Sequence, residues 1–435
     1  MGFDGERILS RLTRLSEVKN MKQVQPMTYS LFPGYHCPLL GAMLTVKEIE
    51  DSVMLVIGPD ECGLYTKMAT SSPGMKPRGC EIFSVVLDQH DVTFGCQEKL
   101  DEAMEELMDE YKPQAVYLVT TCVVEVIGDD IESLAEGYME RYDLPVIVVH
   151  AENFKTDDHL PGIEHTLDAS LDVMEPQDMC DCVNVLGLRL GDFEKTEVYR
   201  VLRENGIDTH MNLPGKTSVE QIRTAPQARC NIVVHPVGIP LAKQMEKRFG
   251  TPYILFERYS DPDRILASYR ALFEAFDRPV PEKLLAQHVA LKQAVTDARR
   301  VLDGKRYISG NTALCNYELH AFLASSLGVT PQLLQISYLD PESKAFRDQL
   351  LEHCDPLVTR AANMTAMQYI YPVLRPDFVI GGGSPQVMRE YAIAPVRMMQ
   401  AYNTLGLEVG EMVVAAFLQA DRDGAKLRAA REAVS

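Results

Sequence analysis

The chain has 435 residues, of which 46% are hydrophobic and 24% are charged, and its formal net charge is -19. This balance is typical of a globular protein with two or three domains. The acidic excess argues against a basic face that binds nucleic acid, and no stretch approaches the roughly 20 apolar residues of a membrane span. Residues 1–20 lack the apolar core of a signal peptide, so we expect a cytoplasmic protein.

Short apolar runs alternate with amphipathic segments along the chain. The predicted strands are Ser52–Gly58, Ala115–Thr121, Pro145–His150, Val183–Leu188, Ile232–His235, Arg306–Gly310, Leu333–Ser337 and Asp377–Gly381. The predicted helices are Glu98–Tyr111, Asp129–Tyr142, Glu194–Asn205, Pro240–Phe249 and Tyr317–Leu327. The strands contain few polar residues, as parallel strands covered on both faces do. This alternation predicts α/β domains with doubly wound parallel sheets.

Two features divide the chain into domains. The long helical stretch Asp261–Asp303 interrupts the alternation, and a second boundary lies near Glu175–Asp181. We therefore predict an N-terminal lead helix and three Rossmann-like α/β domains around a central cleft. The lead helix covers residues 1–30, and the domains cover 31–178, 179–303 (with the long helical connection) and 304–435.

Three of the ten cysteines occupy positions that suit chemistry. Ten cysteines are too few for a disulfide scaffold in a chain of this length, so they are core residues, metal ligands or redox thiols. Cys62 and Cys122 each follow a predicted strand, and ligands of open parallel sheets bind at the carboxyl ends of strands. Cys37 precedes Pro38, which indicates a helix start where the helix dipole lowers a thiol pKa.

A single cysteine is more often an inert core thiol than a ligand. Three cysteines at strand ends and helix starts of one domain weaken that interpretation. The glycines beside them, which would let the backbone approach a bulky inorganic cluster, are Gly34, Gly41, Gly58 and Gly63. The spacing is not the C-x-x-C pattern of zinc ribbons or ferredoxins, so spacing alone leaves the choice open.

Four segments around these cysteines carry a family pattern. They are Gly34–Ala42 (GYHCPLLGA), Ile57–Gly63 (IGPDECG), Phe94–Leu100 (FGCQEKL) and Thr120–Asp130 (TTCVVEVIGDD). Further matches are Ser218–Gln221, Ala225–Pro226, Asn231–Val234 and Arg375–Phe378. Together they resemble the nitrogenase component 1 family over nearly the whole chain, and Thr120–Asp130 is the most specific of them.

This resemblance implies a pairing of homologous subunits, as a dimer or an α2β2 tetramer. It also implies that three cysteines of each subunit bind an iron–sulfur cluster at the interface, either a P-cluster-like 8Fe cluster or a 4Fe–4S cluster. Cys37, Cys62 and Cys122 match these ligands. A separate ATP-dependent iron protein homodimer would supply electrons. In this chain Pro214–Thr217 lacks the first glycine of a phosphate-binding loop, because position 210 is His210.

Two positions depart from the family pattern. In α-type nitrogenase subunits a cysteine and a late histidine anchor the large catalytic cofactor, whereas the matching positions here are His235 and Val409. The resemblance therefore favours a β-type subunit that relays electrons. The secondary site candidates are His235, Cys96, which replaces a glycine usual in the family, and Cys230 and Cys315, which lie near the predicted cleft.

We interpret the chain as the electron-relay subunit of a nitrogenase-like reductase whose catalytic metallocofactor is held mainly by the partner chain. The chain is shorter than usual nitrogenase β-subunits, which favours an organic substrate such as a methylthio-alkane over dinitrogen. The alternatives are a non-catalytic scaffold for cofactor assembly, a nitrogenase or tetrapyrrole-reductase subunit, and a ligand-binding α/β protein without metal. Several assembly homologues lack the third cysteine, so Cys122 argues against the scaffold.

Overall fold

The computed structural model describes residues 4–433 apart from 30–36, 73–75, 153–157, 189–191, 257–260, 311–315, 337–338, 340, 361–363 and 402–403. The chain forms two compact units that interleave along the sequence. One unit consists of residues 1–34, 194–200 and 257–435, and the other consists of residues 35–193 and 201–256. We call them the terminal unit and the central unit.

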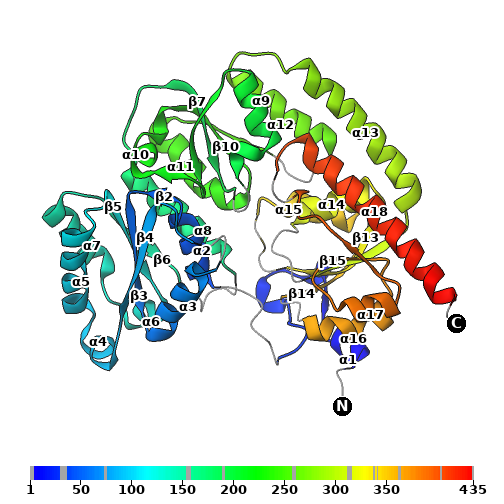
Figure 1. Cartoon of the computed structure of the whole chain (residues 1–435), viewed down its shortest axis with the longest axis horizontal. Helices are drawn as coiled ribbons and strands as arrows, with labels where there is room; N and C mark the ends of the chain where they lie inside the picture. Colours follow the sequence, from blue (N-terminus) through cyan, green and yellow to red (C-terminus); the bar gives the residue numbers. More distant parts are fainter. Residues whose placement is uncertain are drawn as a thin grey trace. The chain divides into compact units, whose positions relative to one another are not determined.

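The first sheet of the central unit has four parallel strands. Their order is β4 (Cys80–Val86), β3 (Ser52–Gly58), β5 (Ala115–Thr120) and β6 (Val146–His150). Helices α5 (Gln97–Glu110) and α7 (Ile131–Tyr142) cover one face and bury its apolar side chains (Figure 1). The other face carries α2 (Pro38–Val46), α3 (Asp60–Thr70) and α8 (Leu160–Ala169). The short helices α4 (Gln89–Phe94) and α6 (Cys122–Ile127) follow β4 and β5 along the chain.

The second sheet of the central unit is also parallel. Its order is β11 (Tyr253–Leu255), β10 (Ala228–Val233), β7 (Cys180–Leu186) and β8 (Asp208–Leu213). Its helices are α9 (Glu197–Glu204), which also enters the terminal unit, α10 (Val219–Arg223) and α11 (Ile239–Phe249). A two-stranded ladder of β2 (Ile49–Glu50) and β9 (Thr217–Ser218) links the two sheets within this unit.

The terminal unit contains a sheet of six strands. Their order is β1 (Thr13–Arg14), β14 (Leu357–Thr359), β13 (Thr330–Gln335), β12 (Arg306–Gly310), β15 (Phe378–Gly381) and β16 (Ala394–Val396), and β1 alone runs antiparallel to its neighbour. The helices are α1 (Gly5–Leu9), α12 (Pro262–Ala275), α13 (Glu282–Leu302), α14 (Tyr317–Ser325), α15 (Lys344–Leu351), α16 (Met364–Leu374), α17 (Pro385–Glu390) and α18 (Leu407–Glu432). Helices α1 and α16 pack on one face and α18 on the other (Figure 1).

The predicted fold class is confirmed, because the chain is α/β with several parallel, Rossmann-like sheets. The predicted lead helix is wrong in extent. Residues 4–29 contain only the five-residue helix α1, the strand β1 and two short 3-10 turns. The helix ends at Leu9 with Ser10 as its C-cap, and Ile8, Leu12 and Met27 bury their side chains in the core of the terminal unit. The division of the chain into three domains stays a prediction.

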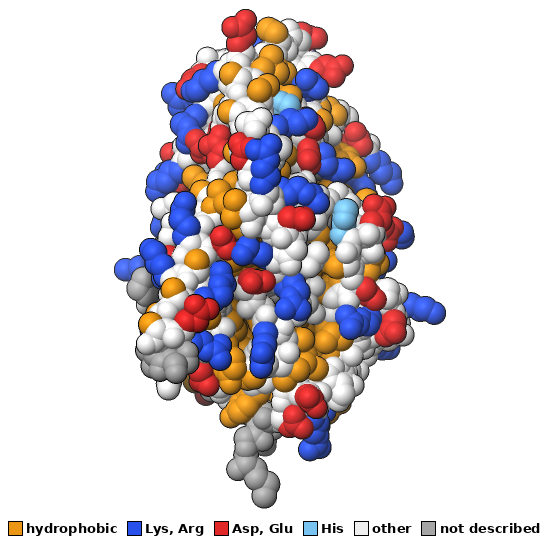
Figure 2. All heavy atoms as spheres, turned by 90° about the vertical axis from the view of Figure 1, so that its right-hand side faces the viewer, with side chains coloured by type: hydrophobic (Ala, Val, Ile, Leu, Met, Phe, Trp, Pro, Cys, Tyr) orange, Lys and Arg blue, Asp and Glu red, His pale blue; other side chains and the backbone are white. Residues whose placement is uncertain are grey.

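No helix in the described part of the chain is long and apolar enough to cross a membrane. On the face shown in Figure 2, acidic and basic side chains are intermingled rather than segregated. This face therefore offers no single-sign patch, in contrast to the acidic helix α5, where seven carboxylates accompany one lysine.

Candidate iron–sulfur cluster site

The first sheet of the central unit brings Cys37, Cys62 and Cys122 to helix starts. Cys122 is the first residue of α6, directly after β5, and Cys62 lies in the first turn of α3, after β3. The two strands are neighbours in the sheet, so both thiols lie beyond the same carboxyl edge. Cys37 is the N-cap residue of α2, with Pro38 at the first helical position. None of the three forms a disulfide.

The three thiols lie close enough to one another to influence thiol pKa values. Burial raises the pKa of the Cys37 thiol, and the nearby Cys122 adds to the increase. Burial also raises the pKa of Cys62, and the nearby Cys37 and Cys122 raise it further. A hydrogen bond with the Thr121 side chain lowers this pKa but does not outweigh the increase. The expected lowering at the Cys37 helix start is therefore wrong in net direction. Hydrogen bonds from the backbone at the start of α2 do lower the pKa, but desolvation outweighs them.

The chemistry of the donor set, three thiols, fits an iron–sulfur cluster. In the described ranges, no group of three or more His, Cys, Asp or Glu side chains could hold one metal ion. A cluster binds each thiolate to a different iron, which requires thiols that share a region without converging on one point. All three thiols are partly exposed, so each is open on one side to a bound group or a partner chain.

Two glycines shape this region in different ways. A Cβ atom at Gly58 would lie 2.3 Å from Thr121 Oγ1, so the end of β3 closely approaches the residue before Cys122. The expected approach of this backbone to a cluster stays a prediction. A Cβ atom at Gly41 would instead lie 2.0 Å from the carbonyl oxygen of His159. Gly41 therefore serves the packing of α2 on α8, and through it the position of Cys37.

The secondary cysteine candidates are buried. Cys96 is the N-cap residue of α5, its backbone N–H donates to Asp129 Oδ2 at 3.0 Å, and its side chain belongs to the apolar core beneath α5 and α7. Burial raises the pKa of Cys96 to about 12 and that of Cys230, inside β10, also to about 12. Both are neutral core thiols in this conformation. Cys315 lies outside the described residues.

His235 is the N-cap of the short 3-10 turn Pro236–Gly238 that follows β10. Its side chain is 8% exposed, and its Nδ1 accepts a hydrogen bond of 3.3 Å from the N–H of Val237. One ring nitrogen is thus engaged in capping the turn. Val409 is fully buried in the first turn of α18 and offers no ligand atom. His235 therefore uses one ring nitrogen in the turn, and Val409 cannot act as a ligand.

The structure adds a polar group that the sequence analysis did not select. His150 ends β6, and its Nδ1 and Nε2 lie 2.6 Å from Glu125 Oε1 and 2.8 Å from Glu132 Oε1. Burial lowers the pKa of His150, but the hydrogen bond and charge of Glu125, with the charges of Glu132 and Glu152, outweigh it and raise the pKa overall. A cavity of about 530 Å³ adjoins this histidine. The sequence feature that could have identified His150 is its position at the carboxyl end of the predicted strand Pro145–His150.

Comparisons with known proteins identify the family of the chain. A sequence profile of the nitrogenase component 1 type oxidoreductases matches residues 37–407. The chain is 34% identical over 236 residues to the nitrogenase iron-molybdenum cofactor biosynthesis protein NifE of Clostridium pasteurianum, an alignment that covers 52% of this chain and 51% of that protein. It is 28% identical over 360 residues to NifE of a Nostoc species, covering 80% and 75% of the two chains.

Among solved structures, nitrogenase Cp1 at pH 6.5 superposes with a TM-score of 0.74 at 17% identity, covering 91% of this chain and 94% of that one. This likeness concerns the fold. Because the profile spans most of the sequence, the chain belongs to the nitrogenase component 1 type oxidoreductase family. Proteins of this family bind iron–sulfur clusters.

Proposed function

We propose that the chain is an iron–sulfur subunit of a nitrogenase-like complex and that Cys37, Cys62 and Cys122 bind its cluster. The observation that carries the proposal is that three helix starts, each bearing a thiol, lie in one region of the central unit, two of them at one edge of a parallel sheet. The mutual electrostatic effect of the three thiols supports it. When bound, the cluster would accept and release single electrons at low potential.

The residues of the chain would position and tune that cluster. Each thiol must lose its proton on binding iron, and the free N–H groups of the helix starts favour the resulting thiolates. Gly58 and Thr121 let the loops after β3 and β5 approach each other closely. The apolar core beneath α5 and α7 keeps this edge of the sheet rigid, which limits reorganisation when the charge of the site changes.

Three thiolates leave a cluster short of protein ligands, so the proposal includes a homologous partner subunit that completes the site, in a dimer or an α2β2 tetramer. It also includes a separate ATP-dependent iron protein as electron donor. The receiving cofactor would be held mainly by the partner, since His235 caps a turn and Val409 is an apolar core residue. An organic substrate, such as a methylthio-alkane, completes this proposal.

A second candidate function is supported by the relatives. Both curated relatives described above are named as proteins of iron-molybdenum cofactor biosynthesis. In that case the same three thiols would hold a cluster in a scaffold on which a cofactor is assembled. The two functions predict different products: a reductase complex turns over substrate, whereas a scaffold transfers a finished cofactor to an acceptor protein.

Anaerobic purification with iron analysis and electron paramagnetic resonance tests the shared part of both functions. Cys37→Ala, Cys62→Ala and Cys122→Ala should each lose the cluster or convert it, with iron falling by about half or more. Cys354→Ala is the matched control, because Cys354 lies beyond α15 and its thiol donates to the carbonyl oxygen of Leu350, at 3.7 Å. Wild-type iron content in the three ligand variants would refute the proposal.

Reconstitution then separates the two functions. The purified complex, an iron protein, ATP and a reductant are incubated either with candidate substrates or with a cofactor-free nitrogenase. Reduction of an organic substrate supports the reductase, and activation of the acceptor protein supports the scaffold.

A further inference from the structure

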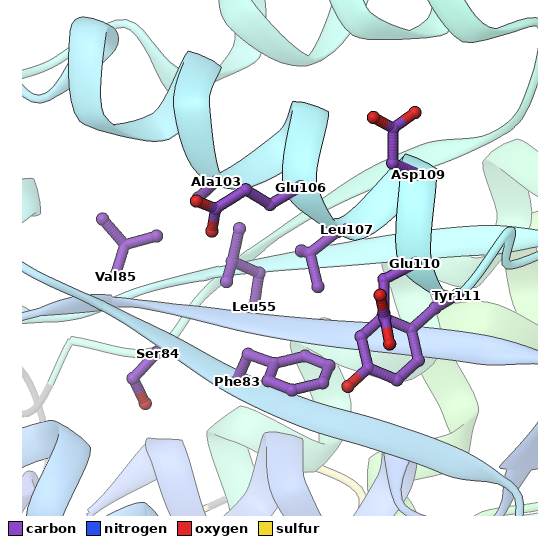
Figure 3. A pocket seen from close by; sticks show the side chains of 10 residues that line it. All are labelled: Leu55, Phe83, Ser84, Val85, Ala103, Glu106, Leu107, Asp109, Glu110 and Tyr111. Atoms are coloured by element: carbon purple, nitrogen blue, oxygen red, sulfur yellow. The ribbon is translucent and has the colours of Figure 1, made fainter.

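A second pocket lies on the other side of the same sheet domain, between the edge strand β4 and the end of helix α5. Its volume is about 600 Å³, within the range of ligand sites. Leu55, Val85 and Leu107 form an apolar floor, and Phe83 and Tyr111 form one wall (Figure 3). No cysteine of the proposed cluster site lines it.

The aromatic wall suits a cation. The rings of Phe83 and Tyr111 lie with their centroids 4.9 Å apart and are tilted by 51°. Tyr111 is 44% exposed, so part of its ring is open to a ligand. The faces of such rings carry negative charge density and attract guanidinium or ammonium groups.

The rim of the pocket is acidic. Glu106, Asp109 and Glu110 line it, and none of the three forms a salt bridge with another described residue. Figure 3 shows the carboxylate of Glu110 beside the ring of Tyr111, that of Glu106 above Leu55, and that of Asp109 pointing away from the rings. A carboxylate beside two aromatic rings, with a second one above the apolar floor of the same pocket, forms a receptor for a cationic side chain with an apolar stem.

The edge strand indicates that this cation belongs to a polypeptide. In the described part of the chain, β4 pairs only with β3, so its outer side is an open edge. Open edges bind extended peptides through backbone hydrogen bonds, and every second side chain of such a peptide then points toward the same face. Lys99 protects only the carboxyl end of this edge, where its ammonium group donates to the carbonyl oxygen of Val86 at 3.2 Å.

We propose that β4 and the adjoining pocket bind an extended, arginine-bearing segment of a partner protein. The segment adds a strand beside β4 and places an arginine against Phe83 and Tyr111, with Glu106 and Glu110 neutralising its charge. The acidic surface of α5, with seven carboxylates and one lysine, attracts the basic segment before it docks. This binding site is independent of the cluster and of either function proposed above.

The test uses the full chain and four probes. The first is a nine-residue peptide of alternating Arg and Val, and the second has Glu in place of Arg. The third is the Arg peptide N-methylated at every second residue, and the fourth is N-acetyl-arginine amide. Isothermal titration calorimetry should detect binding of the first peptide alone. Glu106→Gln with Glu110→Gln should weaken it about tenfold. Tyr111→Leu should weaken it as well, while leaving the melting temperature close to that of the wild type.

The matched control is Glu98→Gln with Glu102→Gln, the same change of charge at the same four-residue spacing on α5 but outside the pocket. It should leave affinity within about twofold of the wild type. Equal losses in the two double variants would overturn the proposal, because they would show attraction by the acidic helix alone. Binding of the N-methylated peptide or of N-acetyl-arginine amide as tight as that of the Arg peptide would also overturn it, because neither then needs the edge of β4.

Discussion

The carboxylate of Glu197 accepts a hydrogen bond of 2.6 Å from the hydroxyl group of Tyr269, and both side chains are buried in the terminal unit. The same carboxylate accepts the backbone N–H groups of Leu407 and Glu408, each at 2.9 Å, and thereby caps the start of α18. It also accepts an amide hydrogen bond of 2.9 Å from Gln287. One buried carboxylate thus connects α9, α12, α13 and α18.

Glu197→Ala should lower the free energy of unfolding by about 3 kcal/mol or more, because four donors would lose their common acceptor inside the protein. Glu204→Ala, at the exposed end of the same helix, should change it by no more than about 0.5 kcal/mol. Urea denaturation followed by circular dichroism measures both. Equal stability of the two variants would show that the network around Glu197 contributes little.

Acid should destabilise the terminal unit through His320. Its Nδ1 lies 2.7 Å from the hydroxyl group of Tyr307, and burial lowers its pKa from 6.5 to about 3. The unfolded chain therefore binds a proton below pH 6.5 that the folded chain refuses. This group alone should reduce stability by about 1.4 kcal/mol per pH unit as the pH falls from 6.5 toward 3.

His320→Gln keeps a polar side chain beside Tyr307 but removes this titration. The slope of unfolding free energy against pH between 4 and 6 should therefore be smaller in the variant by about one proton. Identical slopes in the two proteins would mean that His320 becomes protonated in the folded state.

Gly162→Ala should disturb the candidate cluster site without touching a thiol. A Cβ atom at Gly162 would lie 1.8 Å from the carbonyl oxygen of Pro38, so α8 would push away the start of α2 and with it Cys37. We expect a loss of stability of about 2 kcal/mol and reduced iron content. Gly137→Ala is the control, because a Cβ atom at Gly137 in α7 would meet nothing within 4 Å, and this variant should be neutral or stabilising. Thermal melts and iron analysis distinguish the two variants.

His235 is expected to have a structural role. His235→Asn retains a side chain that caps the turn after β10, whereas His235→Ala removes the cap and should cost about 1 kcal/mol. Both variants should retain the wild-type content of the catalytic cofactor when they are purified with the partner chain. Loss of that cofactor in both, with the cluster signal intact, would instead make this chain the subunit that holds the active site.

The bounds of strands β3 and β12 could be predicted to the residue. The beginning of β10 could not, because the strand starts at Ala228 and contains the polar residue Asn231. Asn231 is tolerated in the core because Asn184 Nδ2 donates to its side-chain oxygen at 2.9 Å. That partner lies on another strand, β7, so a local pattern cannot show it.

The edge strand β4 was missed for a related reason. Its sequence, CEIFSVV, interrupts the apolar residues with Glu81 and Ser84, and in the described part of the chain it pairs only with β3. The placement of Cys62 and Cys122 after strands follows from topology and could be predicted. The direction of the pKa shifts of Cys37 and Cys62 could not be predicted. Their desolvation depends on segments that pack nearby from elsewhere in the chain, such as α2, which begins after Cys37.

The interleaving of the two units orders their appearance during synthesis. The central unit is complete once the ribosome has translated residue 256, whereas the terminal unit needs both the first 34 residues and everything after residue 256. Helix α1 and strand β1 must therefore wait, unpaired, through more than 300 residues of translation before β14 arrives. A chain cut short before that point would carry a finished central unit and an N-terminal segment without its sheet.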